Sequence, residues 1–114
     1  MDKCIFCKIL NGDIKAKKVY EDDYTLAFHD ISPQAPTHLL VITREHFSGI
    51  HEIPDEKMEI IAKLFIAVSK VVTQEGLVKN GYRIVLNSGK ESGQEVPHIH
   101  VHILAGRPMH WPPG

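Results

Sequence analysis

Apolar and polar residues alternate along several short stretches of this chain, which is the pattern of half-buried β-strands. The clearest stretch is residues 98–104, where three histidines are separated by isoleucine and valine. Successive side chains of a strand point to opposite faces, so the three imidazoles should share one face. Similar alternation predicts strands over His38 to Thr43 and Tyr82 to Asn87, and a hairpin that joins Val19–Tyr20 to Tyr24–His29.

Two other stretches carry apolar residues at the helical spacing of three and four positions. Ile5 to Leu10 predicts a short helix that ends at Asn11–Gly12. Asp55 to Gln74 predicts one long helix, with Asp55 as its N-cap and Gly76 as its stop signal. Further apolar positions widen its face beyond one stripe, which predicts a second buried side and a homodimer. The stripe expected to face the core is Ile61, Leu64, Phe65, Val68 and Val72.

The composition indicates one globular domain over residues 1–114, because 43% of the residues are hydrophobic and 24% are charged. Lysine and arginine number 13 against 14 acidic residues, a formal net charge of −1. This balance argues against a general nucleic-acid or anionic-membrane surface, so we expect neither partner. The start lacks the apolar segment of a secretory signal, and no run approaches the roughly 18 apolar residues of a membrane span. We therefore expect a cytoplasmic protein.

The cysteines of the chain, Cys4 and Cys7, form a single Cys-x-x-Cys pair. In a reducing compartment such a pair indicates half of a metal site or a redox motif. Its position before any predicted strand favours the metal site over a thioredoxin-type motif. Two histidines would complete a closed tetrahedral zinc site. His98, at the end of the histidine row, and His46, outside it, are the candidates, because using His100 would remove the central imidazole of the row.

The histidine row has three interpretations: structural, metal-binding or catalytic. A structural role needs a partner for each buried imidazole, since an unsatisfied one costs roughly 1 to 3 kcal/mol. His38 could join the row if its strand pairs with residues 98–104. A neutral imidazole with one nitrogen held by a carbonyl presents the other as a nucleophile, and no serine or cysteine lies beside the row. These observations favour attack on phosphorus by His100, next to a glycine-containing loop at Asn87 to Glu95 whose backbone could approach an anion.

Residues 98–104 resemble the histidine triad motif, in which three histidines alternate with hydrophobic residues. The resemblance continues through Cys4 to Ile9, Ala27 to His38, the Asn87 to Val96 loop and Gly106 to Gly114, which is nearly the whole chain. The chain is similar to the histidine triad (HIT) family and to its Hint branch. This resemblance implies a single HIT domain with an α+β fold. That fold is an antiparallel five-stranded sheet with one long and one short helix, dimerising through the long helix and the C-terminal region.

The resemblance also implies an activity. It is hydrolysis of the P–N bond of purine nucleoside 5'-phosphoramidates through a nucleotidyl-histidine intermediate, with release of AMP or GMP. His100 would be the nucleophile, His102 would bind the α-phosphate, and His38 and His98 would support His100. No cofactor would be required for catalysis, and the expected partners are a purine nucleotide and a second copy of the chain.

The substrate and metal residues implied by the resemblance fall into four groups. Asp30 matches the acid that binds the ribose. The apolar base pocket corresponds to Ile5, Phe6, Ile9, Phe28 and Ile31, and the phosphate side to Asn87, Gly93, Gln94 and Glu95. Relatives that keep the cysteine pair hold a structural zinc through positions that are here Cys4, Cys7, His46 and His98. Glu95 departs from the serine of many Hint-like sequences, and Pro97 from a residue that is commonly aromatic.

Three other functions are compatible with the sequence. The chain could be a nucleotide-binding regulator with incidental turnover, a metal-dependent hydrolase that uses the histidine row, or a dinucleoside polyphosphate hydrolase. The Trp-Pro-Pro-Gly sequence at residues 111–114 favours the Hint branch over the last of these.

Overall fold

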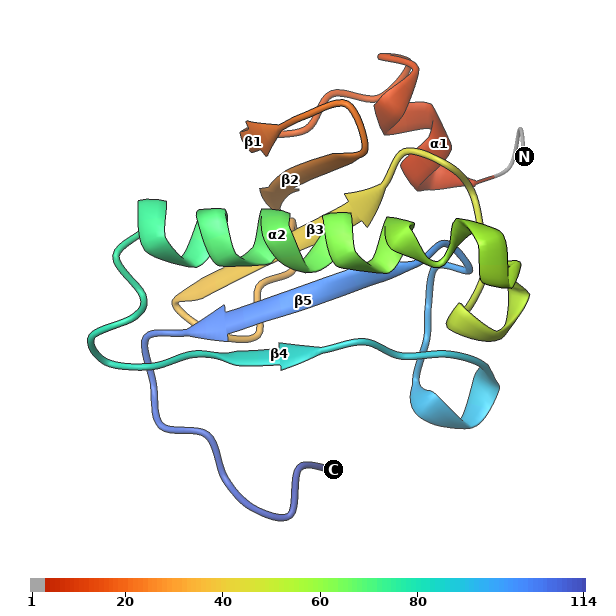
Figure 1. Cartoon of the computed structure of the whole chain (residues 1–114). Coiled ribbons are helices and arrows are strands. Elements are labelled where there is room, and N and C mark those ends of the chain that lie inside the picture. The colour runs from red at the N-terminus through yellow and green to blue at the C-terminus, as the bar shows by residue number, and fades with distance from the viewer. Residues whose placement is uncertain (1–3) are drawn as a thin grey trace.

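The computed structural model describes residues 4–114, whose strands form one five-stranded sheet in the order β1-β2-β3-β5-β4 (Figure 1). All neighbouring strands are antiparallel. The strands are β1 (Lys18–Glu21), β2 (Thr25–His29), β3 (Thr37–Thr43), β4 (Arg83–Val85) and β5 (His100–Ala105). The predicted α+β class and five-stranded antiparallel sheet are confirmed. Strands β3 and β5 lie in the centre, with β2 on one side and β4 on the other.

One long and one short helix accompany the sheet: α2 (Glu59–Gln74) and α1 (Ile5–Leu10). Figure 1 shows α2 lying across one face of the sheet, where it packs on β1, β2, β3 and β5. Short 3₁₀ turns occupy Ile50–Glu52, Asp55–Lys57 and Lys90–Ser92. Among residues 4–114, no helix combines the length and apolar character needed to cross a membrane.

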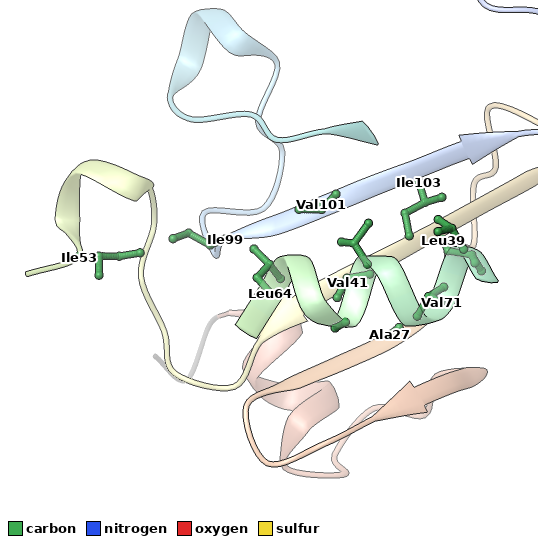
Figure 2. Packing of buried hydrophobic residues seen from close by; sticks show 12 residues of the cluster. Ala27, Leu39, Val41, Ile53, Leu64, Val71, Ile99, Val101 and Ile103 are labelled. Carbon is green, nitrogen blue, oxygen red and sulfur yellow. The ribbon is translucent and has the colours of Figure 1, made fainter. Parts of the chain in front are cut away.

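The two faces of the sheet belong to two different cores. Figure 2 shows the α2 core, in which Leu39 and Val41 of β3 meet Val101 and Ile103 of β5 beneath Leu64 and Val71 of the helix. Side chains on the opposite face, including Phe28, Leu40 and Ile42, pack with Phe6 and Ile9 of α1. In the β3–β5 register, Leu40 pairs with His102 and Ile42 with His100. The histidines therefore lie on the α1 face, because alternate residues of a strand point to opposite sides.

The prediction of one helix from Asp55 was wrong at its start, because α2 begins at Glu59 and Asp55–Lys57 forms a separate 3₁₀ turn. The backbone N–H groups of Lys57 and Met58 donate to residues three positions back, and no side chain caps either segment, so Asp55 is not an N-cap. No residue of that turn is buried. It lacks the core contacts that would hold it in register with α2.

The predicted inward stripe of the long helix was also wrong in one position. Phe65 is 41% exposed, whereas Ala67 and Val71, which lay outside the stripe, are completely buried. The cause is that α2 carries apolar residues around much of its circumference, so periodicity alone does not determine which side meets the sheet. Leu64, Val68 and Val72 are buried as expected.

Two strands are shorter than their sequence patterns predict. The predicted strand at 98–104 begins at His100, because the N–H of His98 donates to Val96 and the N–H of Ile99 donates to Phe47 instead of joining the ladder. The strand predicted over residues 82–87 is confined to Arg83–Val85, the segment that pairs with β5 at the sheet edge. Alternation predicted the faces of these strands correctly but not their ends.

Candidate active site

Strands β3 and β5 bring three histidines together on the α1 face of the sheet. His38 comes from β3, and His100 and His102 come from β5. Nε2 of His38 lies 2.9 Å from Nδ1 of His102, and the ring centroids of His100 and His102 are 4.9 Å apart. The prediction that His38 lies beside the row when the two strands pair is confirmed.

The hydrogen bonds around His38 determine its protonation pattern. The backbone N–H of Gln34 donates to Nδ1 of His38 at 3.0 Å, so this nitrogen is an acceptor and the neutral ring carries its proton on Nε2. That Nε2–H donates to Nδ1 of His102, and Oδ2 of Asp30 lies 3.4 Å from the same Nε2. Neutral His102 must then carry its own proton on Nε2. It therefore presents an N–H donor on the side away from His38.

His100 has the opposite arrangement. Its Nδ1–H donates to the carbonyl oxygen of His98 at 2.6 Å, which leaves a lone pair on Nε2. The ring of Phe6 packs edge-on against His100 with a centroid separation of 5.0 Å and an interplanar angle of 83°. A backbone acceptor and an aromatic contact thus hold the ring, and Nε2 is the basic nitrogen.

Burial keeps these imidazoles neutral. Removal from water lowers the pKa of His100, and it lowers the pKa of His102 to about 4, with smaller contributions from neighbouring His100 and His38. Burial also lowers the pKa of His38, although the carboxylate of Asp30 acts in the opposite direction. A neutral imidazole is the nucleophilic form, so near pH 7 the site holds the form that covalent attack requires.

A second cluster lies beside the row and brings together Cys4, Cys7, His46 and His98. One donor atom from each residue lies within 4.8 Å of every other. Nδ1 of His98 is 3.5 Å from Sγ of Cys4 and 3.1 Å from Nδ1 of His46, and Sγ of Cys7 is 3.4 Å from Nδ1 of His46. A tetrahedral zinc with ordinary bond lengths requires about 3.6 Å between sulfur and nitrogen and about 3.3 Å between two nitrogens. The spacing of the donors fits zinc.

The protonation of His98 also suits a metal. Its Nε2–H donates to the carbonyl of Thr43 at 2.7 Å, so its Nδ1 lone pair is directed at the other three donors. Burial lowers the pKa of His98 to about 4, which keeps the ring neutral. Without a metal, burial and the hydrogen bond with Cys4 raise the pKa of the Cys7 thiol. A cation would favour the thiolate, so metal binding and proton release are linked.

Asp30, His38 and His102 form another group whose donor atoms lie within 4.8 Å of one another. Its hydrogen bonds fit a metal less well. The Gln34 N–H occupies Nδ1 of His38 and leaves the proton on Nε2, the nitrogen that points toward the other two residues. A protonated nitrogen has no lone pair for a metal. The arrangement fits a chain of hydrogen bonds instead.

A cavity of about 690 Å³ opens over the histidine row. His38, His100 and His102 line it, and so do most residues that the resemblance implied for substrate: Asp30, Ile5, Phe6, Ile9, Phe28, Ile31, Asn87, Gly93 and Glu95. Gln94 is the exception. Its Oε1 accepts from the N–H of Gly89 and its Nε2 donates to the carbonyl of Ser48, each at 2.8 Å, so its side chain holds the loop.

Several lining residues were not anticipated from the sequence. They are Ile14, Lys15, Ala16, His29, Ser32, Gln34, Leu40 and Val96. Leu40 could have been found, because it lies two residues after His38 on the same face of a predicted strand. The segment at 14–16 carries no motif, and only the folded chain places it against the cavity.

Comparison with known proteins identifies the family of this chain. Residues 11–109 match the HIT domain, and the chain belongs to the HIT family. It is 46% identical over 112 residues to the 14 kDa zinc-binding protein of Zea mays, an alignment that covers 96% of this chain and 87% of that protein. It is 40% identical over 108 residues to the purine nucleoside phosphoramidase of Escherichia coli K12, with coverage of 95% and 91%. The crystal structure of a HIT family hydrolase from Legionella pneumophila superposes with a TM-score of 0.93 at 50% identity, covering 98% of this chain and all of that one (100%).

The protonation pattern can be read from the imidazole nitrogens by long-range proton–nitrogen NMR. We expect His100 to carry its proton on Nδ1 and His38 on Nε2. His102 should remain neutral as the pH falls from 7 to 5, because its pKa is about 4 in the folded chain against 6.5 for an ordinary histidine. The unfolded chain takes up this proton first, so the free energy of unfolding should decrease as the pH falls from about 6.5 toward about 4. Protonation of His102 near pH 6.5, or a proton on Nε2 of neutral His100, would contradict this structure.

Proposed function

We propose that this chain is a hydrolase that cleaves the P–N bond of purine nucleoside 5'-phosphoramidates and releases the nucleoside monophosphate. The observation that carries the proposal is the 2.6 Å hydrogen bond from Nδ1–H of His100 to the carbonyl of His98. It leaves Nε2 of His100 as a nucleophile in a cavity that His102 also lines. The name of the Escherichia coli relative, a purine nucleoside phosphoramidase, supports the same substrate class.

The proposed reaction has two steps at phosphorus. Nε2 of His100 attacks the α-phosphorus, the bond to the amine breaks, and the amine departs after taking a proton from solvent. A nucleotidyl group is then bonded to His100. Water attacks the same phosphorus, gives up a proton, and displaces His100 with its lone pair restored. Each step exchanges one bond at phosphorus for another, so two smaller barriers replace one large barrier.

The histidine beside the nucleophile stabilises the charge that develops on phosphoryl oxygens. Nε2–H of His102 is a donor because Nδ1 of the ring is occupied by His38. Preorganised donors of this kind lower the barrier most effectively in a site with little water. His38 acts through His102, which it orients, and His98 acts through its carbonyl.

The rest of the cavity is assigned to the nucleoside. The base lies against the apolar residues from α1 and β2, with Phe6 and Phe28 as aromatic walls. Asp30 accepts hydrogen bonds from the ribose hydroxyls, and its carboxylate is held by the N–H of Ser32 at 2.7 Å. The phosphate lies on the histidines, next to the backbone of Asn87 and Gly93.

Cys4, Cys7, His46 and His98 are proposed to hold a structural zinc ion. The donor set and its spacing support this assignment, as does the name of the Zea mays relative. Four protein ligands fill a tetrahedral zinc, so its contribution is stability. The ion would fix α1, which carries Cys7 and Phe6, against the segments that hold His46 and His98.

Replacement of the nucleophile tests the reaction. His100→Asn should reduce kcat with an adenosine phosphoramidate by roughly three orders of magnitude or more, because the covalent intermediate cannot form. Rapid quenching and mass spectrometry should detect nucleotidylated wild-type protein and no adduct on the variant. His51→Asn, which changes a histidine outside the cavity, is the matched control and should keep full turnover. Equal rates for His100→Asn and wild type would exclude the nucleophile role.

Removal of the metal separates a structural zinc from a catalytic one. The purified protein should contain one zinc per chain, and chelation should lower its melting temperature before it affects turnover of protein that is still folded. His46→Gln should lose the zinc, whereas His51→Gln should retain it. Immediate loss of turnover on chelation, with the melting temperature unchanged, would instead favour a metal-dependent hydrolase.

The chain is further proposed to form a homodimer through α2 and the β4 edge. Ile66 on α2 is 47% exposed and Ile84 on β4 is 39% exposed. Ile84 pairs with Ile103, whose side chain lies in the α2 core, so Ile84 is on the same face of the sheet as the helix. A second copy would cover this apolar surface and the free edge of β4.

Sedimentation or light scattering can measure the assembly state. Wild type should have twice the mass of one chain at micromolar concentration, and Ile84→Glu should shift it to monomer, because the interface would then bury an unpaired charge. Lys79→Glu provides a control charge change outside the sheet. A monomeric wild type at these concentrations would refute the dimer.

A further inference from the structure

Glu95 lines the same cavity as His100 and His102. The side chain is exposed, and none of the ion pairs found in residues 4–114 includes it. Lys15 is the one lysine or arginine among the described lining residues, and it belongs to the segment between α1 and β1. A negative charge thus stands unneutralised in a site for phosphoryl transfer, where it would repel an anionic substrate group.

The loop between β4 and β5 holds Glu95 at this position. Ser92 Oγ–H donates to the carbonyl of Gly89 at 2.6 Å, and Gln94 ties the N–H of Gly89 to the carbonyl of Ser48. These bonds direct Gln94 toward the 3₁₀ segment that follows β3, and the next residue, Glu95, lines the cavity. The loop conformation therefore places the backbone of Glu95 at the cavity.

The strand order shows which part of the substrate would meet Glu95. Phe28 and Asp30 lie at the end of β2, on one side of the histidines of β3 and β5, whereas Asn87 and Glu95 follow β4 on the other side. Figure 1 shows the same separation, with α1 toward the β2 side and the Lys90–Ser92 turn toward the β4 side. With base and ribose on the β2 side and phosphorus at His100, the leaving group extends toward β4.

We infer that Glu95 selects substrates by the charge of the leaving group: it favours amines that carry a second, positively charged group and disfavours anionic leaving groups such as carboxylated amines or phosphates. This inference rests on the proposed phosphoramidate hydrolysis. Opposite charges at exposed positions attract by up to about 1 kcal/mol, or roughly fivefold in rate constant for each charge. The same repulsion discriminates against dinucleoside polyphosphates, whose leaving group is a nucleotide with anionic phosphates.

Three adenosine 5'-phosphoramidates of matched length test the inference. Their leaving amines are 1,3-diaminopropane, n-butylamine and β-alanine, which place a positive charge, no charge and a negative charge at the far end. For wild type we expect kcat/KM to fall in that order, with a cationic-to-anionic ratio of roughly 4 to 25. Glu95→Gln should bring this ratio close to one. Glu91→Gln removes an acid from the same loop that does not line the cavity, and it should keep the wild-type ratio.

The possible failures are distinguishable. Turnover with an equal charge ratio in wild type and Glu95→Gln overturns the inference and leaves phosphoramidate hydrolysis intact. An equal loss of the ratio in Glu91→Gln also overturns it, because the effect would then belong to the net charge of the loop. If the wild type hydrolyses none of the three compounds, the proposed function fails and the inference fails with it. Glu95→Ser provides a second uncharged variant if the glutamine variant does not fold.

Discussion

The hydrogen bond between Nδ1–H of His100 and the carbonyl of His98 determines which nitrogen of the central histidine is basic. His98 is also the residue whose Nδ1 reaches the cysteine cluster and whose Nε2–H binds the carbonyl of Thr43. One residue therefore connects the central imidazole of the row, the cysteine cluster and the end of β3. Any movement of α1, which carries Phe6 and Cys7, would reach His100 through these contacts.

The parts of the fold that could be predicted from sequence are those that a local pattern of apolar and polar residues determines. Alternation over residues 98–104 placed the histidines on one face, and the same parity placed His38 beside them. The order of the strands has no local pattern and was not predicted, because the resemblance to a family implied only five antiparallel strands. The orientation of α2 could not be predicted from its sequence. Apolar residues lie on most sides of this helix, so their spacing does not show which side is buried, and Phe65 was assigned to the wrong side.

The residues of the site also fall into those that a local pattern predicts and those that it does not. Residues on strands, such as His100 and His102, follow from period-two patterning, whereas residues on loops depend on contacts between distant segments. The hydrogen bond from Gln94 to Ser48 joins positions 46 residues apart and decides that Gln94 supports the loop while Glu95 lines the cavity. Nothing in the sequence near Gln94 or Glu95 indicates which of the two lines the cavity. The segment that contains Lys15 likewise carries no motif that would predict its place at the cavity.

The alternation of core and histidine side chains along β5 restricts how this protein can diverge. Insertion of one residue within the strand would reverse every side chain beyond it, so that imidazoles would replace valine and isoleucine beneath α2. A change in the length of β5 by one residue would therefore disrupt the core and the histidine row together. Exposed residues of the loop that precedes the strand, such as Glu95, lie outside this alternation. Such a position can change its side chain without reversing any residue of β5.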